Sequence, residues 1–132
     1  DSPYAQTQCP DLILSEHSTW KRIYLHRMKH SKICIASTGL HQSSGWKIAE
    51  YLAAGRAIVS EPLCYEVPGP FQAGENYLTY TSADGCIEQI RTLLAHPEQI
   101  LQMGQRNRAY YDEWLRPDQI VTKALEQAKI LL

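Results

Sequence analysis

The sequence lacks long apolar runs and lacks a marked excess of charge of either sign. No apolar run approaches the roughly 18 residues that a membrane-spanning helix needs, so no transmembrane segment is predicted. The formal net charge is −1, which argues against nucleic acid as a partner, because binding to a phosphate backbone favours a clear basic excess. The hydrophobic fraction of 44% is typical of a globular protein, and 132 residues are enough for one domain.

Closely spaced cysteines are lacking as well. The four cysteines, Cys9, Cys34, Cys64 and Cys86, form neither a CxxC pair nor a metal-type spacing. Cys34 lies in a short apolar run, where a free thiol packs like a small apolar side chain. We therefore expect four reduced, structural cysteines and a cytoplasmic protein, because disulfides form mainly in oxidising compartments.

A metal-binding motif is incomplete. His26 and His30 are four residues apart on a predicted helix, as two ligands of one ion can be. The zinc-protease motif requires glutamate directly after the first histidine, and Arg27 occupies that position. We expect both histidines to lie on the surface, and we predict no metal site.

The most informative stretch is residues 32–62. Residues 33–36 and 57–60 are short apolar runs, of the kind that is buried on both faces of a parallel sheet. Between them, a small polar turn leads into a helix that ends at Gly55, a residue that adopts positive φ without strain. A strand that enters a helix in this way places backbone N–H groups at the carboxyl edge of the sheet. Open α/β proteins bind phosphates there.

The spacing within this helix suits a nucleotide. Lys47 and Glu50 are three residues apart and share a face. From Ser44 to Glu50 the helix rises by about 9 Å. A diphosphate at the helix N-terminus would therefore place a ribose diol beside Glu50, whose carboxylate can accept two hydroxyl hydrogen bonds, while Lys47 adds positive charge.

The rest of the chain shows an alternation of strands and helices. We predict an irregular lead-in (1–10), a strand (11–15), a helix with Ser18 as N-cap and then the strand–helix–strand unit above. An irregular segment (61–74) follows, and then a strand (76–80) with a capping box at 81–84. Three helices end the chain. The second begins at Pro97 and buries Ile100, Met103, Asn107, Tyr110 and Tyr111, and the last has an apolar face made of Ile120, Val121, Ala124, Leu125, Ala128 and Leu131. This order predicts an α/β fold, a Rossmann-like and mainly parallel sheet flanked by helices, with a helical C-terminal tail, in one domain spanning 1–132.

Seven segments carry a family resemblance. They are STG (37–39), SSGWK (43–47), EYLAAG (50–55), AIVS (57–60), PG (68–69), GENY (74–77) and LAHPE (94–98). Over about residues 29–115 the chain resembles the nucleotide-sugar-binding segment in the C-terminal domain of GT-B glycosyltransferases of the group-1-like kind, which include relatives of the spore-maturation glycosyltransferases. Many members of that superfamily have two glutamates eight positions apart. Glu50 matches the second, and Gln42 stands in place of the first.

The resemblance implies a set of site residues. The nucleotide would be held by Ser43, Ser44, Gly45, Trp46, Lys47 and Glu50, and the sugar would contact Thr38, Gly39, His41 and Gln42. No catalytic residue is assigned, and no cofactor is expected beside the nucleoside-diphosphate sugar, which is the substrate. For residues 61–74 two interpretations stay open, a stiff connector or a wall of the ligand cleft with Glu61, Tyr65 or Glu66 near the sugar.

The function that the resemblance implies is donor binding within a glycosyltransferase. The chain looks like part of a larger two-domain enzyme whose N-terminal domain supplies the acceptor side, so we expect the isolated chain to be inactive in transfer. The alternative is a non-catalytic nucleotide-binding or protein-interaction module. A receiver-like domain is disfavoured because the predicted strands end in Ser15, Ser37 and Ser60 where aspartates would be needed. We also expect a homodimer, joined by residues 12–14 or by the last helix.

Overall fold

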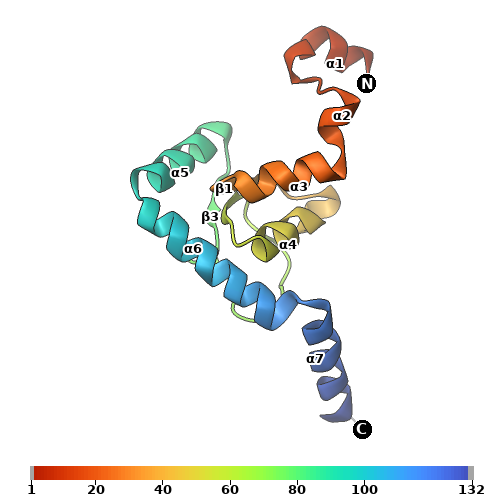
Figure 1. Ribbon diagram of the computed structural model, residues 1–132, viewed down its shortest axis with the longest axis vertical. Coiled ribbons are helices and arrows are strands. Elements are labelled where there is room, and N and C mark those ends of the chain that lie inside the picture. Colours follow the sequence, from red (N-terminus) through yellow and green to blue (C-terminus); the bar gives the residue numbers. More distant parts are fainter. Residues whose placement is uncertain (1, 131–132) are drawn as a thin grey trace. The chain divides into compact units, whose positions relative to one another are not determined.

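The computed structural model describes residues 2–130, without the side chain of residue 130 (Figure 1). The described chain consists of two compact units that divide between His30 and Ser31. The first unit is helical, and the second contains the sheet and the remaining helices. Each unit is described by itself.

The first unit contains the helices α1 (Pro3–Gln8), α2 (Glu16–Thr19) and α3 (Lys21–His30), with a 3₁₀ turn at Pro10–Leu12. The prediction of an irregular lead-in was wrong, because Ser2 caps α1: its Oγ accepts a hydrogen bond from the Ala5 N–H at 3.1 Å. Pro3 at the first helical position favours the same start.

The predicted strand at residues 11–15 is also absent from the described chain. Pro10 begins a 3₁₀ turn there, and Leu12 and Leu14 stay 77% and 58% exposed, so no burial offsets the local turn geometry. Ser18 is not an N-cap. It lies inside α2, whose N-cap is Ser15. His26 and His30 are exposed on α3, which confirms the prediction of surface histidines.

The second unit is built on a parallel sheet. The strands β1 (Ile33–Ala36), β2 (Ala57–Ser60) and β3 (Leu78–Thr79) lie in the order β1-β2-β3, with Ala36 opposite Ser60 and Ser60 opposite Thr79. The described sheet has three strands where the sequence pattern predicted four, and β3 is shorter than the predicted 76–80. The predicted fold class is confirmed: the fold is α/β, with a parallel Rossmann-like sheet, flanking helices and a C-terminal helix.

The helices of this unit are α4 (Gly45–Ala53), α5 (Ala83–Ala95), α6 (Pro97–Tyr110) and α7 (Pro117–Ile130), with a π-helical turn at Tyr111–Leu115 between the last two (Figure 1). Gly55 has φ +60 and ends α4, and Pro97 begins α6, both as predicted. The capping box predicted at 81–84 does not form, because the N-cap of α5 is Ser82 and the residue three positions on is Gly85. Ser82 Oγ accepts from the Gly85 N–H, and Gly85 has no side chain to reach back.

The core lies between the sheet and the helices α5 and α6. Ala57 and Val59 of β2 pack with Leu93 of α5 and Met103 of α6, and all four are almost completely buried. Cys34 of β1 is also buried, and burial raises the pKa of its thiol to about 11. All four cysteines are free, and Cys64 is exposed.

The end of the chain is less buried. Ile120, Val121 and Leu125 of α7 are 46%, 59% and 59% exposed, so the predicted apolar face of this helix is uncovered in this chain. Residue 131, which the prediction placed on the same face, lies outside the described residues. None of the helices among residues 2–130 is long and apolar enough to cross a bilayer.

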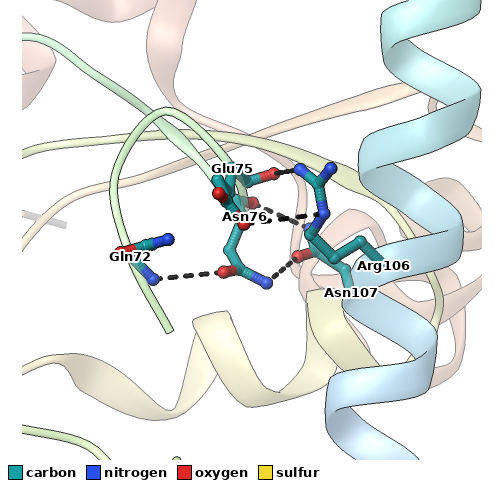
Figure 2. A network of polar contacts seen from close by, with 5 residues as sticks. All are labelled: Gln72, Glu75, Asn76, Arg106 and Asn107. Carbon is teal, nitrogen blue, oxygen red and sulfur yellow. Dashed lines mark hydrogen bonds and ion pairs between the residues drawn. The ribbon is translucent and has the colours of Figure 1, made fainter. Parts of the chain in front are cut away.

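Two buried asparagines join α6 to the rest of the second unit (Figure 2). The Asn76 side-chain amide donates to Asn107 Oδ1 at 3.1 Å, and Asn107 Nδ2 donates to the carbonyls of Arg56 at 2.8 Å and Asn76 at 2.9 Å. Asn76 Oδ1 also accepts from the Gln72 N–H. The predicted stripe on α6 is therefore part of the core, and its polar member connects three segments far apart in sequence.

Replacing Asn107 by alanine should lower the free energy of unfolding by about 3 kcal/mol, because it leaves two carbonyls and one amide without their buried partner and opens a cavity. Urea unfolding followed by circular dichroism measures this loss. The control is Gln105→Ala, an exposed change on the same helix, which should stay within about 0.5 kcal/mol of the wild type. Equal effects of the two changes would contradict the role of Asn107.

Two glycines allow α6 to approach the turn after α4. A Cβ added at Gly104 would lie 2.6 Å from the Gly55 carbonyl oxygen, so the backbones are in direct contact. Nearby, Arg108 Nη1 donates to the Ala53 carbonyl at 2.7 Å and Arg108 forms a two-point ion pair with Asp112. The C-terminus of α4 is thus capped by a cation from α6.

The change Gly104→Ala tests this contact, because helix propensity and packing predict opposite effects on the free energy of unfolding. Helix propensity alone would stabilise the variant by about 1 kcal/mol. The overlap with Gly55 should instead destabilise it by about 1–3 kcal/mol, because α6 must move away from the turn. Chemical denaturation gives the value, with exposed Gln102→Ala as the matched helix control. A more stable Gly104→Ala protein would show that the backbones are not in contact.

Candidate functional site

A compact turn joins β1 to α4 at the carboxyl edge of the sheet. The Gly39 N–H donates to the Ser43 carbonyl at 2.8 Å, and Gln42 N–H donates back to the Gly39 carbonyl at 3.0 Å. His41 and Gln42 have φ angles of 56 and 61, which is unusual for residues that are not glycine. Such backbone outliers gather at ligand-binding segments, where the surrounding structure holds them in place.

The N-terminus of α4 is open. Ser44 precedes the helix in a helical conformation, and its side chain makes no capping hydrogen bond. Gly45 has φ +61, and no atom lies within 4 Å of the position its Cβ would occupy. The first backbone N–H groups of a helix lack intrahelical partners and carry the positive end of its dipole. The start of α4 therefore offers donors to an anion.

A carboxylate stands beside this turn. Glu61 follows β2, and its Oε2 accepts hydrogen bonds from the Thr38 N–H and from Thr38 Oγ1, both at 2.7 Å. These bonds favour the ionised form and lower the pKa of Glu61 below 4.5. Tyr80 donates to the Ala36 carbonyl at 3.0 Å, and its pKa is raised by burial and then by the negative charge of Glu61. The edge thus carries one fixed negative charge.

The irregular segment 61–74, predicted as such, lies against the same turn. The Tyr65 hydroxyl donates to the His41 carbonyl at 3.1 Å. A small cavity of about 130 Å³ is lined by Ser44, Gly45, Leu63, Val67 and Phe71, among others. Of the two interpretations of this segment, its position next to the turn fits a cleft wall, and contact with a ligand stays a prediction.

Aromatic contacts anchor the far end of the segment. The Tyr110 hydroxyl donates to the Pro68 carbonyl, and Phe71 stacks on Tyr77 with ring centroids 5.3 Å apart. A Cβ at Gly69 would lie 2.3 Å from the Trp114 ring, so only glycine fits beneath this indole. The segment is therefore held on α6 and on the turn that follows it.

A larger cavity of about 600 Å³ lies away from the turn, next to the end of α4. Its lining includes Lys32, Arg56 and Arg108. Arg56 Nε donates to the Ala54 carbonyl at 2.7 Å, and Arg108 is bound to Asp112 and to a carbonyl of α4. These arginines already cap a helix end, so we assign the cavity to the packing of α4 on α6.

The predicted site residues lie in two neighbouring elements, the turn after β1 and the helix α4. The predicted sugar contacts and Ser43 lie in the turn, and the remaining nucleotide contacts lie at the start of α4 or one to two turns along it. Trp46 is 77% exposed, Lys47 is exposed and Glu50 is half-buried. Thr38 donates two hydrogen bonds to Glu61, one from its backbone N–H and one from its hydroxyl.

Sequence reasoning missed the bond between Thr38 and Glu61. A signal for it was present, since Thr38 and Glu61 follow the ends of two strands that lie next to each other in a parallel sheet. Ala36 is opposite Ser60, so residues just beyond these positions meet at the same edge. Ser60 is buried, and its hydroxyl has no hydrogen-bond partner among the described residues.

Comparison with known proteins identifies the family of this chain. The model of the family described as glycosyl transferase-like matches residues 10–126. That match covers most of the chain, so the chain belongs to the glycosyl transferase-like family, and the expected relation to glycosyltransferases is confirmed at this level. A search of curated proteins and a search of solved structures gave no significant match.

The bond between Glu61 and Thr38 should contribute to the acid dependence of stability. The pKa of Glu61 is lower in the folded chain than its ordinary value of 4.5, so the contribution is present above 4.5 and is lost as the pH falls through the folded pKa. Glu61→Gln should therefore lose less stability than the wild type on acidification below this value. Urea midpoints at several pH values measure the difference.

The control for this experiment is Glu66→Gln, an exposed carboxylate in the same segment for which the acid dependence should stay that of the wild type. Direct titration of the Glu61 carboxyl by NMR gives a second reading. A midpoint at or above 4.5 would contradict the hydrogen-bonded carboxylate.

Proposed function

We propose that this chain binds the diphosphate of a nucleotide-sugar donor at the carboxyl edge of its sheet, as the donor-binding part of a glycosyltransferase. The observation that carries the proposal is the uncapped start of α4, which opens at Gly45 directly after a strained turn. Membership of the glycosyl transferase-like family supports glycosyl transfer as the general activity.

The ligand would lie along the turn and the first turns of α4. Its phosphates would accept hydrogen bonds from the N–H groups at Gly45, Trp46 and Lys47, and the Lys47 ammonium would neutralise charge on the departing diphosphate. Glu50 lies farther along the helix and would accept the two ribose hydroxyls. The sugar would then meet the preceding turn, which holds Thr38, Gly39, His41 and Gln42.

The finer identity follows from the resemblance in sequence. Under this proposal the chain corresponds to the nucleotide-sugar-binding domain of a group-1-like GT-B enzyme, related to the spore-maturation kind, and works in the cytoplasm without a separate cofactor. A further domain would supply the acceptor. Transfer requires the acceptor to lie in line with the anomeric carbon, in a cleft that excludes water.

A second candidate is a non-catalytic interaction module of the same fold. The uncovered apolar face of α7 favours it, because exposed apolar patches of this kind commonly mark contacts with other proteins. A homodimer through this helix would be one form of it. Nucleotide binding at the turn separates the two candidates.

The donor site is tested by titrating the ¹⁵N-labelled chain with UDP or GDP. We expect shift changes centred on residues 43–50. Glu50→Ala should weaken nucleoside-diphosphate binding by about tenfold or more, because hydrogen bonds to a charged group are lost, and should leave inorganic pyrophosphate almost unaffected. Glu88→Ala, an exposed carboxylate on α5, is the control.

Two results would count against the donor site. The absence of any shift at residues 43–50 with millimolar nucleotide would remove the nucleotide from the proposal. Equal losses for pyrophosphate and nucleotide in Glu50→Ala would remove the ribose contact while leaving the phosphate site in place.

A further inference from the structure

One oxygen of the Glu61 carboxylate accepts two hydrogen bonds, and the other accepts none from the described residues. Both bonds come from Thr38 and end on Oε2. The side chain is half-buried at the end of β2, beside the turn that leads to α4. Because both bonds from Thr38 end on Oε2, Oε1 is left to accept a hydrogen bond from a ligand.

We propose that Glu61 is a specificity-determining residue that accepts a hydrogen bond from a hydroxyl of the donor's sugar. The inference rests on the proposed function and assigns the polyhydroxylated end of the ligand to the Thr38–Glu61 pair. The Thr38 hydroxyl donates its hydrogen bond to Glu61, so Thr38 Oγ1 can only accept hydrogen bonds from a ligand. Glu61 Oε1 can likewise only accept. This edge therefore selects groups that donate hydrogen bonds.

Charge sets the orientation of the ligand. A carboxylate repels phosphate, so the diphosphate cannot lie against Glu61. The donors for the phosphates are at the other end of the same turn, where α4 begins after Ser44, whose side chain makes no capping hydrogen bond, and exposed Lys47 follows. A ligand that places its sugar hydroxyls at Glu61 and its phosphates at the start of α4 therefore makes favourable contacts at both ends of the turn.

The ionisation of Glu61 supports the same role. Its pKa is lowered by the bonds from Thr38, so the carboxylate is charged at neutral pH. Hydroxyl groups bind a charged acceptor more strongly than a neutral one, and a site that needs such a bond rejects analogues that lack the hydroxyl. If Glu61 served only to hold the turn, its substitution would change the affinity for a nucleotide and for its sugar conjugate equally.

The test compares two affinities in each variant of the full chain. Wild type, Glu61→Gln and Glu88→Gln are titrated with UDP and UDP-glucose, and with GDP and GDP-mannose, using NMR shifts at residues 37–50. Glu61→Gln should weaken binding of the nucleotide sugar that the wild type prefers by about tenfold. It should change the matching nucleoside diphosphate less than twofold, and Glu88→Gln, an exposed change on α5, should change neither.

The possible results separate the two proposals. Equal losses for the sugar conjugate and the nucleotide, or no loss in Glu61→Gln, would overturn the sugar contact while leaving the donor site intact. A wild type that binds none of the four probes would contradict the proposed function, and the inference would fall with it. If Glu61→Gln does not give a folded spectrum, Glu61→Asp, which withdraws the carboxylate by one methylene group, is measured by the same ratio.

Discussion

The hydrogen bonds between Asn76 and Asn107 are the interaction on which the second unit depends (Figure 2). A buried amide without a partner costs free energy, so these two side chains specify one position of α6 against β2 and against the segment before β3. The Gly55–Gly104 contact lets α6 lie directly against the turn after α4. Once α6 is in place, Tyr110 and the Trp114 turn hold the far end of residues 61–74. The candidate site thus depends on packing well away from it.

At the carboxyl edge, the arrangement of charge is as informative as the shape. Glu61 concentrates negative charge at one end of the turn between β1 and α4, and the open start of α4 supplies positive potential at the other. A ligand that carries both hydroxyls and phosphates suits this division, and a simple anion suits only half of it. The left-handed residues His41 and Gln42 lie between the two ends and are held by Tyr65 and by the turn itself.

Much of this organisation could be predicted from local patterns. The positions of β1 and β2, the start of α6 at Pro97 and the burial of Met103, Asn107 and Tyr110 were predicted correctly. Burial on both faces holds for β2 but was wrong for β1, where Ile35 is 49% exposed. The errors fall where local preference competes with a partner that must come from elsewhere. Residues 12–14 form a short apolar run that resembles a strand, but Pro10 starts a 3₁₀ turn there and Leu12 and Leu14 stay exposed.

The sequence by itself determined the strand–turn–helix unit and the position of the helix start, because periodicity, glycine and proline act over a few residues. It also carried the resemblance that indicates the class of protein, in short segments between residues 37 and 98. Only the tertiary structure decided that Thr38 donates hydrogen bonds to Glu61 and that Asn76 donates one to Asn107. It also decided that the backbones of Gly55 and Gly104 are in contact. These pairs are 23 to 49 positions apart, and they meet only because parallel strands bring their ends to one edge and α6 crosses the turn at Gly55. The physical reason is that such contacts depend on how the elements pack.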